Sequence, residues 1–96
     1  MNQEEFIEIC RSGTAEQVRE AIEAGAGGAD LNAADENGIP PLLWAAGQGG
    51  PEVVTLLLDA GADPGLRDKE GRRALEHARG NKGLKGTDAL ARLEAL

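Results

Sequence analysis

The residues best suited to acid–base or metal chemistry are scarce in this chain. His77 is the only histidine and Cys10 is the only cysteine. A protein-bound zinc ion needs about three or four His, Cys or carboxylate ligands close together, and neither a second histidine nor a nearby cysteine accompanies His77. We therefore expect His77 to be a polar-tipped residue that packs between helices beside Trp44, which precedes it by 33 residues.

The thiol of Cys10 is poorly placed for nucleophilic chemistry. A reactive cysteine needs a base or a cationic pocket that lowers its pKa, and the sequence offers only the neighbouring Arg11. A free cysteine otherwise behaves as a small apolar residue. The sequence therefore predicts a buried and inert Cys10, with no intrachain disulfide.

Carboxylates and glycines add no catalytic signal. The 17 Asp and Glu residues show no spacing that singles out an acid–base pair, so we expect most of them on solvated helix faces. The run Gly25-Ala26-Gly27-Gly28 follows a predicted helix and lacks the Lys-Ser/Thr of a phosphate-binding loop, so it predicts a lengthened hairpin. The sequence thus predicts a protein that is not an enzyme and has no cofactor or metal site.

Charge is distributed unevenly along the chain. The net charge is −7, with 12 acids and 2 bases up to Leu66, but 5 acids and 8 bases from Arg67 onward. Nucleic-acid binding needs a basic face and rings that stack on bases, so this composition predicts no nucleic-acid partner. The basic stretch is either a solvated end of the fold or a patch that attracts an acidic segment of a partner. Its members are Arg67, Lys69, Arg72, Arg73, Arg79, Lys82 and Lys85.

The elements that position these residues must form one small domain. The chain has 96 residues, 41% of them hydrophobic, and its only aromatic side chains are one Trp and one Phe. The core must therefore be built from Leu, Ile, Val and Ala. We see neither a signal peptide nor an apolar run long enough to cross a bilayer, which predicts a soluble, cytoplasmic protein with no membrane partner.

The sequence contains an internal repeat. A first set of residues recurs after 33 positions and a second set after 36 positions, the difference being a three-residue insertion at Gly25-Ala26-Gly27. The first set is Asp35, Gly38, Leu42 and Ala45, which recur as Asp68, Gly71, Leu75 and Ala78. The second set is Gly13, Val18, Ile22 and Gly25, which recur as Gly49, Val54, Leu58 and Gly61.

Each copy combines a turn sequence with short apolar segments. Asp35-Glu36-Asn37-Gly38 is typical of a turn, and Pro41 and Pro51 stand where the first turn of a helix tolerates proline. Helices this short are unstable alone, so only packing between copies can hold them. The expected helices cover residues 4–12, 14–24, 42–48, 51–60, 73–79 and 87–96.

The central copy resembles a nearly complete ankyrin repeat. The resemblance rests on DENGIPPLLWAA at residues 35–46 and on GGPEVVTLLLDAGAD at residues 49–63. Weaker copies flank it, and residues 81–88 are similar to the tails of small bacterial ankyrin proteins. The resemblance implies an all-α solenoid of three helix–turn–helix units with hairpin-like finger loops. Its parts would be an N-terminal capping repeat (1–34), a central repeat (35–67) and a C-terminal capping repeat (68–96).

The chain departs from the family pattern where the first helix of each unit begins. The family's Thr-Pro-Leu-His reads Pro40-Pro41-Leu42-Leu43 in the central unit and Arg73-Ala74-Leu75-Glu76 in the third. Both copies lack the threonine that caps the helix and the histidine that braces adjacent loops. Loss of one cap costs about 1 kcal/mol, so we expect looser fingers and marginal stability.

The resemblance also implies a concave binding surface made of finger tips and first helices. Leu43, which stands at the position of the bracing histidine, would offer an apolar contact. Trp44 would be either buried between helix layers or a binding anchor on this surface. The predicted contact residues are Glu36, Asn37, Ile39, Leu43 and Gln48 from the central unit, and Lys69, Glu70, Arg72 and Arg79 from the third.

These observations predict a non-catalytic module that binds a partner protein through its concave face and finger loops. The alternative is an inhibitor or immunity-type protein that masks a toxin or an enzyme, which the small size and the acidic front half would also fit. We expect a monomer, while an apolar end of the stack could also support weak self-association.

Overall fold

The computed structural model describes residues 3–23 and 31–95. Within these ranges the chain forms six α-helices and one short 3-10 helix, and it contains no strand. This architecture confirms the predicted all-α fold. The α-helices are α1 (Gln3–Ser12), α2 (Ala15–Glu23), α3 (Pro41–Gln48), α4 (Pro51–Asp59), α5 (Ala74–Arg79) and α6 (Asp88–Glu94), and the 3-10 helix is η2 (Lys82–Leu84).

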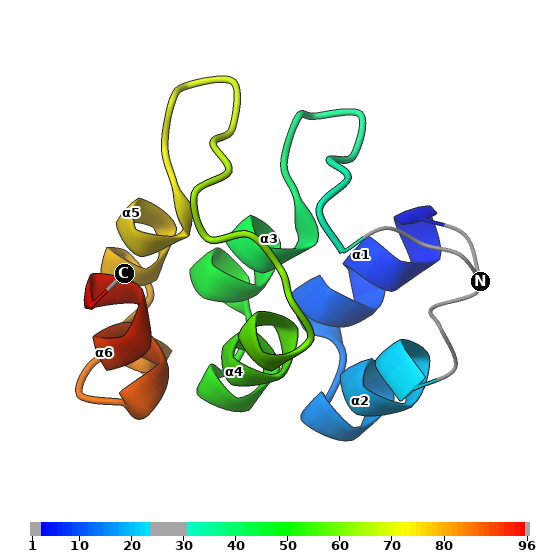
Figure 1. The fold of residues 1–96 in the computed structure, drawn as a ribbon, viewed down its shortest axis with the longest axis horizontal. Helices are drawn as coiled ribbons and strands as arrows, with labels where there is room; N and C mark the ends of the chain where they lie inside the picture. Colours follow the sequence, from blue (N-terminus) through cyan, green and yellow to red (C-terminus); the bar gives the residue numbers. More distant parts are fainter. Residues whose placement is uncertain (1–2, 24–30, 96) are drawn as a thin grey trace.

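The α-helices form three antiparallel pairs arranged in two rows (Figure 1). One row contains α1, α3 and α5, and the other contains α2, α4 and α6, with contacts along each row and within each pair. The loops that precede α3 and α5 project from the same side of the stack as fingers (Figure 1). We call the pairs α1–α2, α3–α4 and α5–α6 the first, second and third units.

The core runs continuously through the three units. Its largest fully buried side chains are aliphatic except for Phe6 and Cys10, in line with the composition. Because each helix is short, burial between units must supply most of the stability of the fold. The core includes Phe6, Val18, Leu42, Leu43, Val54, Leu57 and Leu84.

Most helices begin and end within two residues of the predicted positions. Thr14 starts α2, since its hydroxyl accepts from the Gln17 N–H at 3.1 Å and the Gln17 side chain accepts from the Thr14 N–H at 2.9 Å. Prolines occupy the first turns of α3 and α4. Gly61, with a φ of 103°, lets the chain turn after α4. The helix η2 was not predicted.

Polar bonds join neighbouring units. The Asn81 Nδ2 group donates to the carbonyls of Ala46 and Gly49, both at 3.0 Å, and thereby satisfies acceptors that the end of α3 leaves open. Arg92 of α6 pairs with Asp59 of α4 at 2.9 Å. The predicted hairpin at 25–28 lies outside the described residues, and the boundaries of the three repeats stay a prediction.

Candidate functional site

The finger before α3 is fixed by one carboxylate. Asp35 Oδ1 accepts from the backbone N–H groups of Asn37 (2.9 Å) and Ile39 (3.0 Å). Asp35 Oδ2 accepts from the indole Nε1 of Trp44 at 2.7 Å. Gly38, with a φ of 79°, provides the left-handed turn that closes the loop. One side chain therefore shapes the finger and attaches it to α3.

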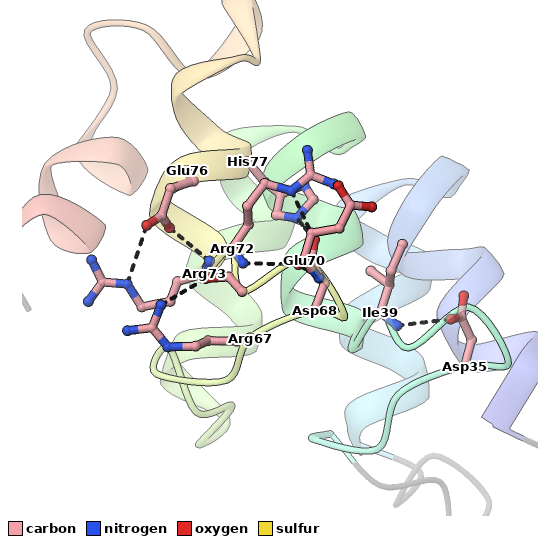
Figure 2. Close-up of polar contacts among 10 residues, drawn as sticks. Asp35, Ile39, Arg67, Asp68, Glu70, Arg72, Arg73, Glu76 and His77 are labelled. Carbon is pink, nitrogen blue, oxygen red and sulfur yellow. Dashed lines mark hydrogen bonds and ion pairs between the residues drawn. The ribbon is translucent and has the colours of Figure 1, made fainter.

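The finger before α5 repeats this arrangement with different donors (Figure 2). Asp68 Oδ1 accepts from the backbone N–H groups of Glu70 and Arg72, both at 2.9 Å. Asp68 Oδ2 lies 2.9 Å from His77 Nε2 and 3.2 Å from Arg72 Nε. An ionised carboxylate only accepts, so His77 Nε2 is the donor. The finger is thus attached to α5 by an imidazole in place of an indole.

Asp68 is held as a buried anion. Its side chain is 3% exposed. The Arg72 backbone N–H does most to lower the pKa of Asp68, to about 2, and the bonds from His77 and Glu70 and the charge of Arg72 act in the same direction against the effect of burial. The carboxylate therefore stays charged at neutral pH and keeps its hydrogen bonds.

The missing family residues are partly replaced. Pro40 provides no side-chain cap for α3, as predicted. At α5, Glu76 accepts from the Arg73 backbone N–H at 2.8 Å, and this bond is the main reason that the pKa of Glu76 is lowered. Trp44 and His77 come directly after the positions where the family has its histidine. Their side chains attach the two fingers to α3 and α5. The prediction of looser fingers did not take into account the bonds that Trp44 and His77 make with the finger carboxylates.

A groove lies between the second and third units, on the face formed by the fingers with α1, α3 and α5, which we call the finger face. The finger tips contribute Ile39 and Arg72, while the helices contribute Trp44, Gln48 and His77. Gly47 of α3 lies against the imidazole, since a Cβ there would lie 3.4 Å from His77 Nδ1. His77 therefore lies beside Trp44 in one groove, as predicted.

A second hollow adjoins this groove between the first and second units. It is lined by α1 and the finger before α3, and its charged side chains are mainly acidic. The Arg11 guanidinium carbon lies 4.7 Å from the centre of the Trp44 ring, which is half-buried. Trp44 is thus neither fully buried nor freely exposed. The polar lining residues are Glu4, Glu8, Arg11, Asp35, Glu36 and Asn37.

The predicted contact residues are distributed over several places. Ile39, Gln48 and Arg72 line the groove between the second and third units, and Glu36 and Asn37 line the acidic hollow. Lys69 and Glu70 are exposed on the finger before α5. Lys69 also extends over the other finger, because a Cβ on Gly38 would lie 2.7 Å from its Cγ.

Two of the predicted contact residues, Leu43 and Arg79, differ from the others in exposure or in position. Leu43 is 0% exposed and belongs to the core, and it lies beneath the groove between the second and third units without an exposed surface of its own. Its apolar side chain is removed from water at this position, which favours the fold. Arg79 is exposed but lines neither hollow. It follows His77 by two positions, which places it on the opposite side of α5.

Two bases of the predicted basic patch, Arg72 and Arg73, are paired with carboxylates within the third unit. Arg72 pairs with Asp68 at 3.2 Å and with Glu70 at 2.9 Å. Arg73 lies 3.6 Å from Glu76. Arg67 Nη1 donates to the Gly71 carbonyl at 2.8 Å (Figure 2). The members of the predicted patch that make no ion pair with a described residue are Arg67, Lys69, Arg79, Lys82 and Lys85.

The other features that could carry chemistry are the Cys10 thiol and a possible metal site. Cys10 is 0% exposed, and burial raises the pKa of its thiol to about 12, which confirms the prediction of a buried, inert residue. Residues 3–23 and 31–95 bring no three His, Cys, Asp or Glu side chains together as a metal site. In the same ranges, no helix has the length and apolarity to cross a membrane.

The comparisons with known proteins agree with this geometry. The family model for ankyrin repeats (3 copies) matches residues 6–93. The chain is similar to human DNA-binding protein RFXANK, with 37% identity over 74% of this chain and 26% of that protein. It is also similar to human ankyrin repeat family A protein 2, with 48% identity over 50% of this chain and 15% of that protein. A third relative is E3 ubiquitin-protein ligase KEG of Arabidopsis thaliana, with 39% identity over 65% of this chain and 4% of that protein. The matched segments thus make up only a minor part of each relative.

Proposed function

Because the chain belongs to the ankyrin-repeat family, whose repeats generally mediate protein–protein interaction, we propose that it is a non-catalytic module that binds a partner protein through its finger face. The observation that carries this proposal is the pair of adjoining hollows along α1, α3 and α5. They unite finger and helix side chains from all three units on one surface.

The attached fingers suit such binding. Each finger is held to its helix through a carboxylate, at 2.7 Å from Trp44 in one case and 2.9 Å from His77 in the other. A loop that is already ordered loses little conformational entropy when a partner binds. The finger face therefore offers a preformed surface.

The chemistry of the groove supports a mixed apolar and polar contact. The half-buried Ile39 and Trp44 provide apolar area, and aromatic side chains often dominate binding energy. Gln48 and Arg72 are exposed polar groups beside them. The acidic hollow next to the groove would guide the approach of a partner that carries positive charge there.

Several finer aspects belong to the same proposal. One relative is named a DNA-binding protein, but the net charge of −7 favours a protein partner for this chain.

We also propose a cytoplasmic location, supported by the single, buried, unpaired cysteine. The relatives named above are animal and plant proteins, so the similarity to bacterial tails stays a prediction. Masking of a toxin or an enzyme is one form of such binding, and no described residue favours it over others.

A site-specific photo-crosslinking experiment tests the proposed surface. A photoreactive amino acid at Gln48 lies in the groove, and the same amino acid at Glu52 lies on the exposed surface of α4 in the other row. In cells of the source organism, we expect Gln48 to give a discrete crosslinked protein that Glu52 does not give. Equal crosslinking from both positions would contradict binding through the finger face.

Substitutions in the groove provide the second part of the experiment. Ile39→Arg should abolish the crosslink from Gln48, because it places a charge on the apolar part of the groove. Glu52→Arg is the matched control and should leave the crosslink intact. Arg72 is less suitable for this purpose, since its substitution would also remove the bond from Arg72 Nε to Asp68 Oδ2, which helps to hold the finger.

A further inference from the structure

Asn37, at the tip of the finger before α3, is the only asparagine of the chain that a glycine follows. The residue is exposed, and its side-chain amide makes no hydrogen bond with a described residue. The side chain of Asn81, by contrast, donates to two carbonyls and accepts from the Gly83 N–H, each at 3.0 Å. The amide of Asn37 is therefore open to water, while that of Asn81 is held.

Gly38 provides a nucleophile next to this amide. Once its backbone nitrogen gives up its proton to a base in solution, it can attack Cγ of Asn37, and glycine has no side chain that hinders the approach. A bond forms between Gly38 N and Asn37 Cγ, the C–N bond of the side-chain amide breaks, and ammonia leaves. Water then opens the resulting cyclic imide. Opening at Cγ gives aspartate, and opening at the main-chain carbonyl gives isoaspartate, in which the backbone runs through Cβ.

We propose that Asn37 is a deamidation site, where water replaces the side-chain amide by a carboxylate, and that Asp35 controls the rate. The Gly38 N–H donates to the Asp35 carbonyl at 2.9 Å. Asp35 Oδ1 also accepts from the N–H groups of Asn37 and Ile39, on both sides of Gly38. The attack therefore requires that the turn opens. Opening of an exposed loop tip costs less free energy than unfolding of the whole chain, so the reaction proceeds in the folded protein.

The finger before α5 shows that the fold accepts a carboxylate at this position. Glu70 stands 33 residues after Asn37, and the glycine after it has a φ of 80°, compared with 79° at Gly38. An aspartate at position 37 should therefore keep the shape of the finger and add a negative charge. Isoaspartate adds one carbon atom to the backbone before Gly38, so it should disturb the bond between the Gly38 N–H and the Asp35 carbonyl.

The modification would also change the proposed binding surface. Asn37 lines the acidic hollow together with Glu4, Glu8 and Glu36, so a carboxylate at position 37 raises the negative charge there. A partner with positive charge would then be attracted more strongly by the aspartate form. This consequence rests on the proposed function, whereas the chemistry of Asn37 does not.

Incubation of the whole folded chain at mildly alkaline pH, followed by digestion at acid pH and tandem mass spectrometry, tests the proposal. We expect the peptide with Asn37 to gain the mass difference between an amide and an acid, and to separate into aspartate and isoaspartate forms. The peptides with Asn32 and Asn81 should keep their amides over the same time. Asn37→Gln should stop the change, because the longer side chain does not form the same imide. None of these measurements involves a partner, so their outcome is independent of the crosslinking test.

Variants of the finger test the control of the rate. Asp35→Ala should speed the reaction several-fold, because it releases the N–H groups on both sides of Gly38. Trp44→Phe removes only the indole donor to Asp35 and should speed it less, which covers the case that Asp35→Ala does not fold. Asp68→Ala is the matched control, since it weakens the other finger and should leave the rate near that of the wild type.

Two results would overturn the proposal. If the amide of Asn37 persists in the folded chain over a time in which it is lost in urea, the fold protects this residue and the site does not exist in the native protein. If Asp68→Ala speeds the reaction as much as Asp35→Ala does, unfolding of the whole chain sets the rate and Asp35 has no specific role.

Discussion

In the second unit, Asp35 binds the indole N–H of Trp44 at 2.7 Å, whereas in the third unit Asp68 binds the imidazole of His77 at 2.9 Å. The two carboxylates also accept the same pair of backbone N–H groups, two and four positions further along the chain. What the two units share is a donor nine positions after an aspartate. The residue type that carries the donor differs.

The same two units differ in how well their helices are covered. Leu42 is 1% exposed, while its counterpart Leu75 is half-buried on the open side of α5. The second unit has a neighbour on each side, and the described residues give the third unit a neighbour on one side only. Equivalent sequence positions therefore face unlike environments, and their contributions to stability should differ accordingly.

Alanine at the two leucines should give the largest difference between the units. We expect Leu42→Ala to lower the free energy of unfolding by about 3 kcal/mol, because it leaves a cavity in the core. Leu75→Ala should lower it by about 1 kcal/mol, because solvent already reaches this side chain. Urea unfolding followed by circular dichroism measures both values. Equal losses would show that Leu75 is as well covered as Leu42.

Removal of the finger carboxylates tests whether the two attachments are equivalent. Asp35→Ala should lower the free energy of unfolding by about 2 kcal/mol, since it leaves backbone N–H groups without their charged acceptor. Asp68→Ala should cost more, because its side chain is 3% exposed and accepts one more bond, from Arg72 Nε. The measurement is again urea unfolding, with Glu36→Ala, an exposed carboxylate on the finger before α3, as the control. A smaller loss at Asp68 than at Asp35 would contradict this order.

Acid pH should remove the contribution of Asp68. Its pKa is lowered from 3.8 to about 2 in the folded chain, so it stabilises the fold fully above about pH 4. That stabilisation is lost as the pH falls toward about 2, where the folded protein also takes up the proton. The difference in urea midpoint between wild type and Asp68→Asn should therefore shrink across this window. A difference that stays constant from pH 4 to pH 2 would exclude this role.

Much of the fold could be predicted from the sequence, because turns, prolines and apolar spacing are local signals. The repeated Asp35 and Asp68, with Gly38 and Gly71, predict the positions of both fingers. The helix η2 was not predicted. Asn81 caps it by accepting from the Gly83 N–H at 3.0 Å, and its Nδ2 group is held by two carbonyls of another unit, which the sequence does not reveal.

The candidate site was harder to predict, because the orientation of a side chain depends on tertiary packing. Leu43 was placed on the surface by analogy with a polar family residue, yet a leucine at that position packs into the core. Arg79 was placed on the finger face, but the short helix α5 turns it away from His77. Trp44 and His77 are 33 residues apart, so the sequence shows that both units have a side-chain donor at this position. The sequence does not show that the acceptors are Asp35 and Asp68.

The donors themselves should give the smallest and most specific difference. Trp44→Phe keeps the ring and removes its N–H, and we expect it to lower the free energy of unfolding by about 1 kcal/mol. His77→Phe should cost less, because Arg72 Nε also donates to Asp68 Oδ2 at 3.2 Å and remains in place. The same change in the Arg72→Gln background removes this second donor, and the cost at position 77 should then rise. If the cost of His77→Phe is the same in both backgrounds, the bond from Arg72 Nε does not contribute to holding the finger. The fingers of the two units would then each depend on a single side-chain donor from the helix.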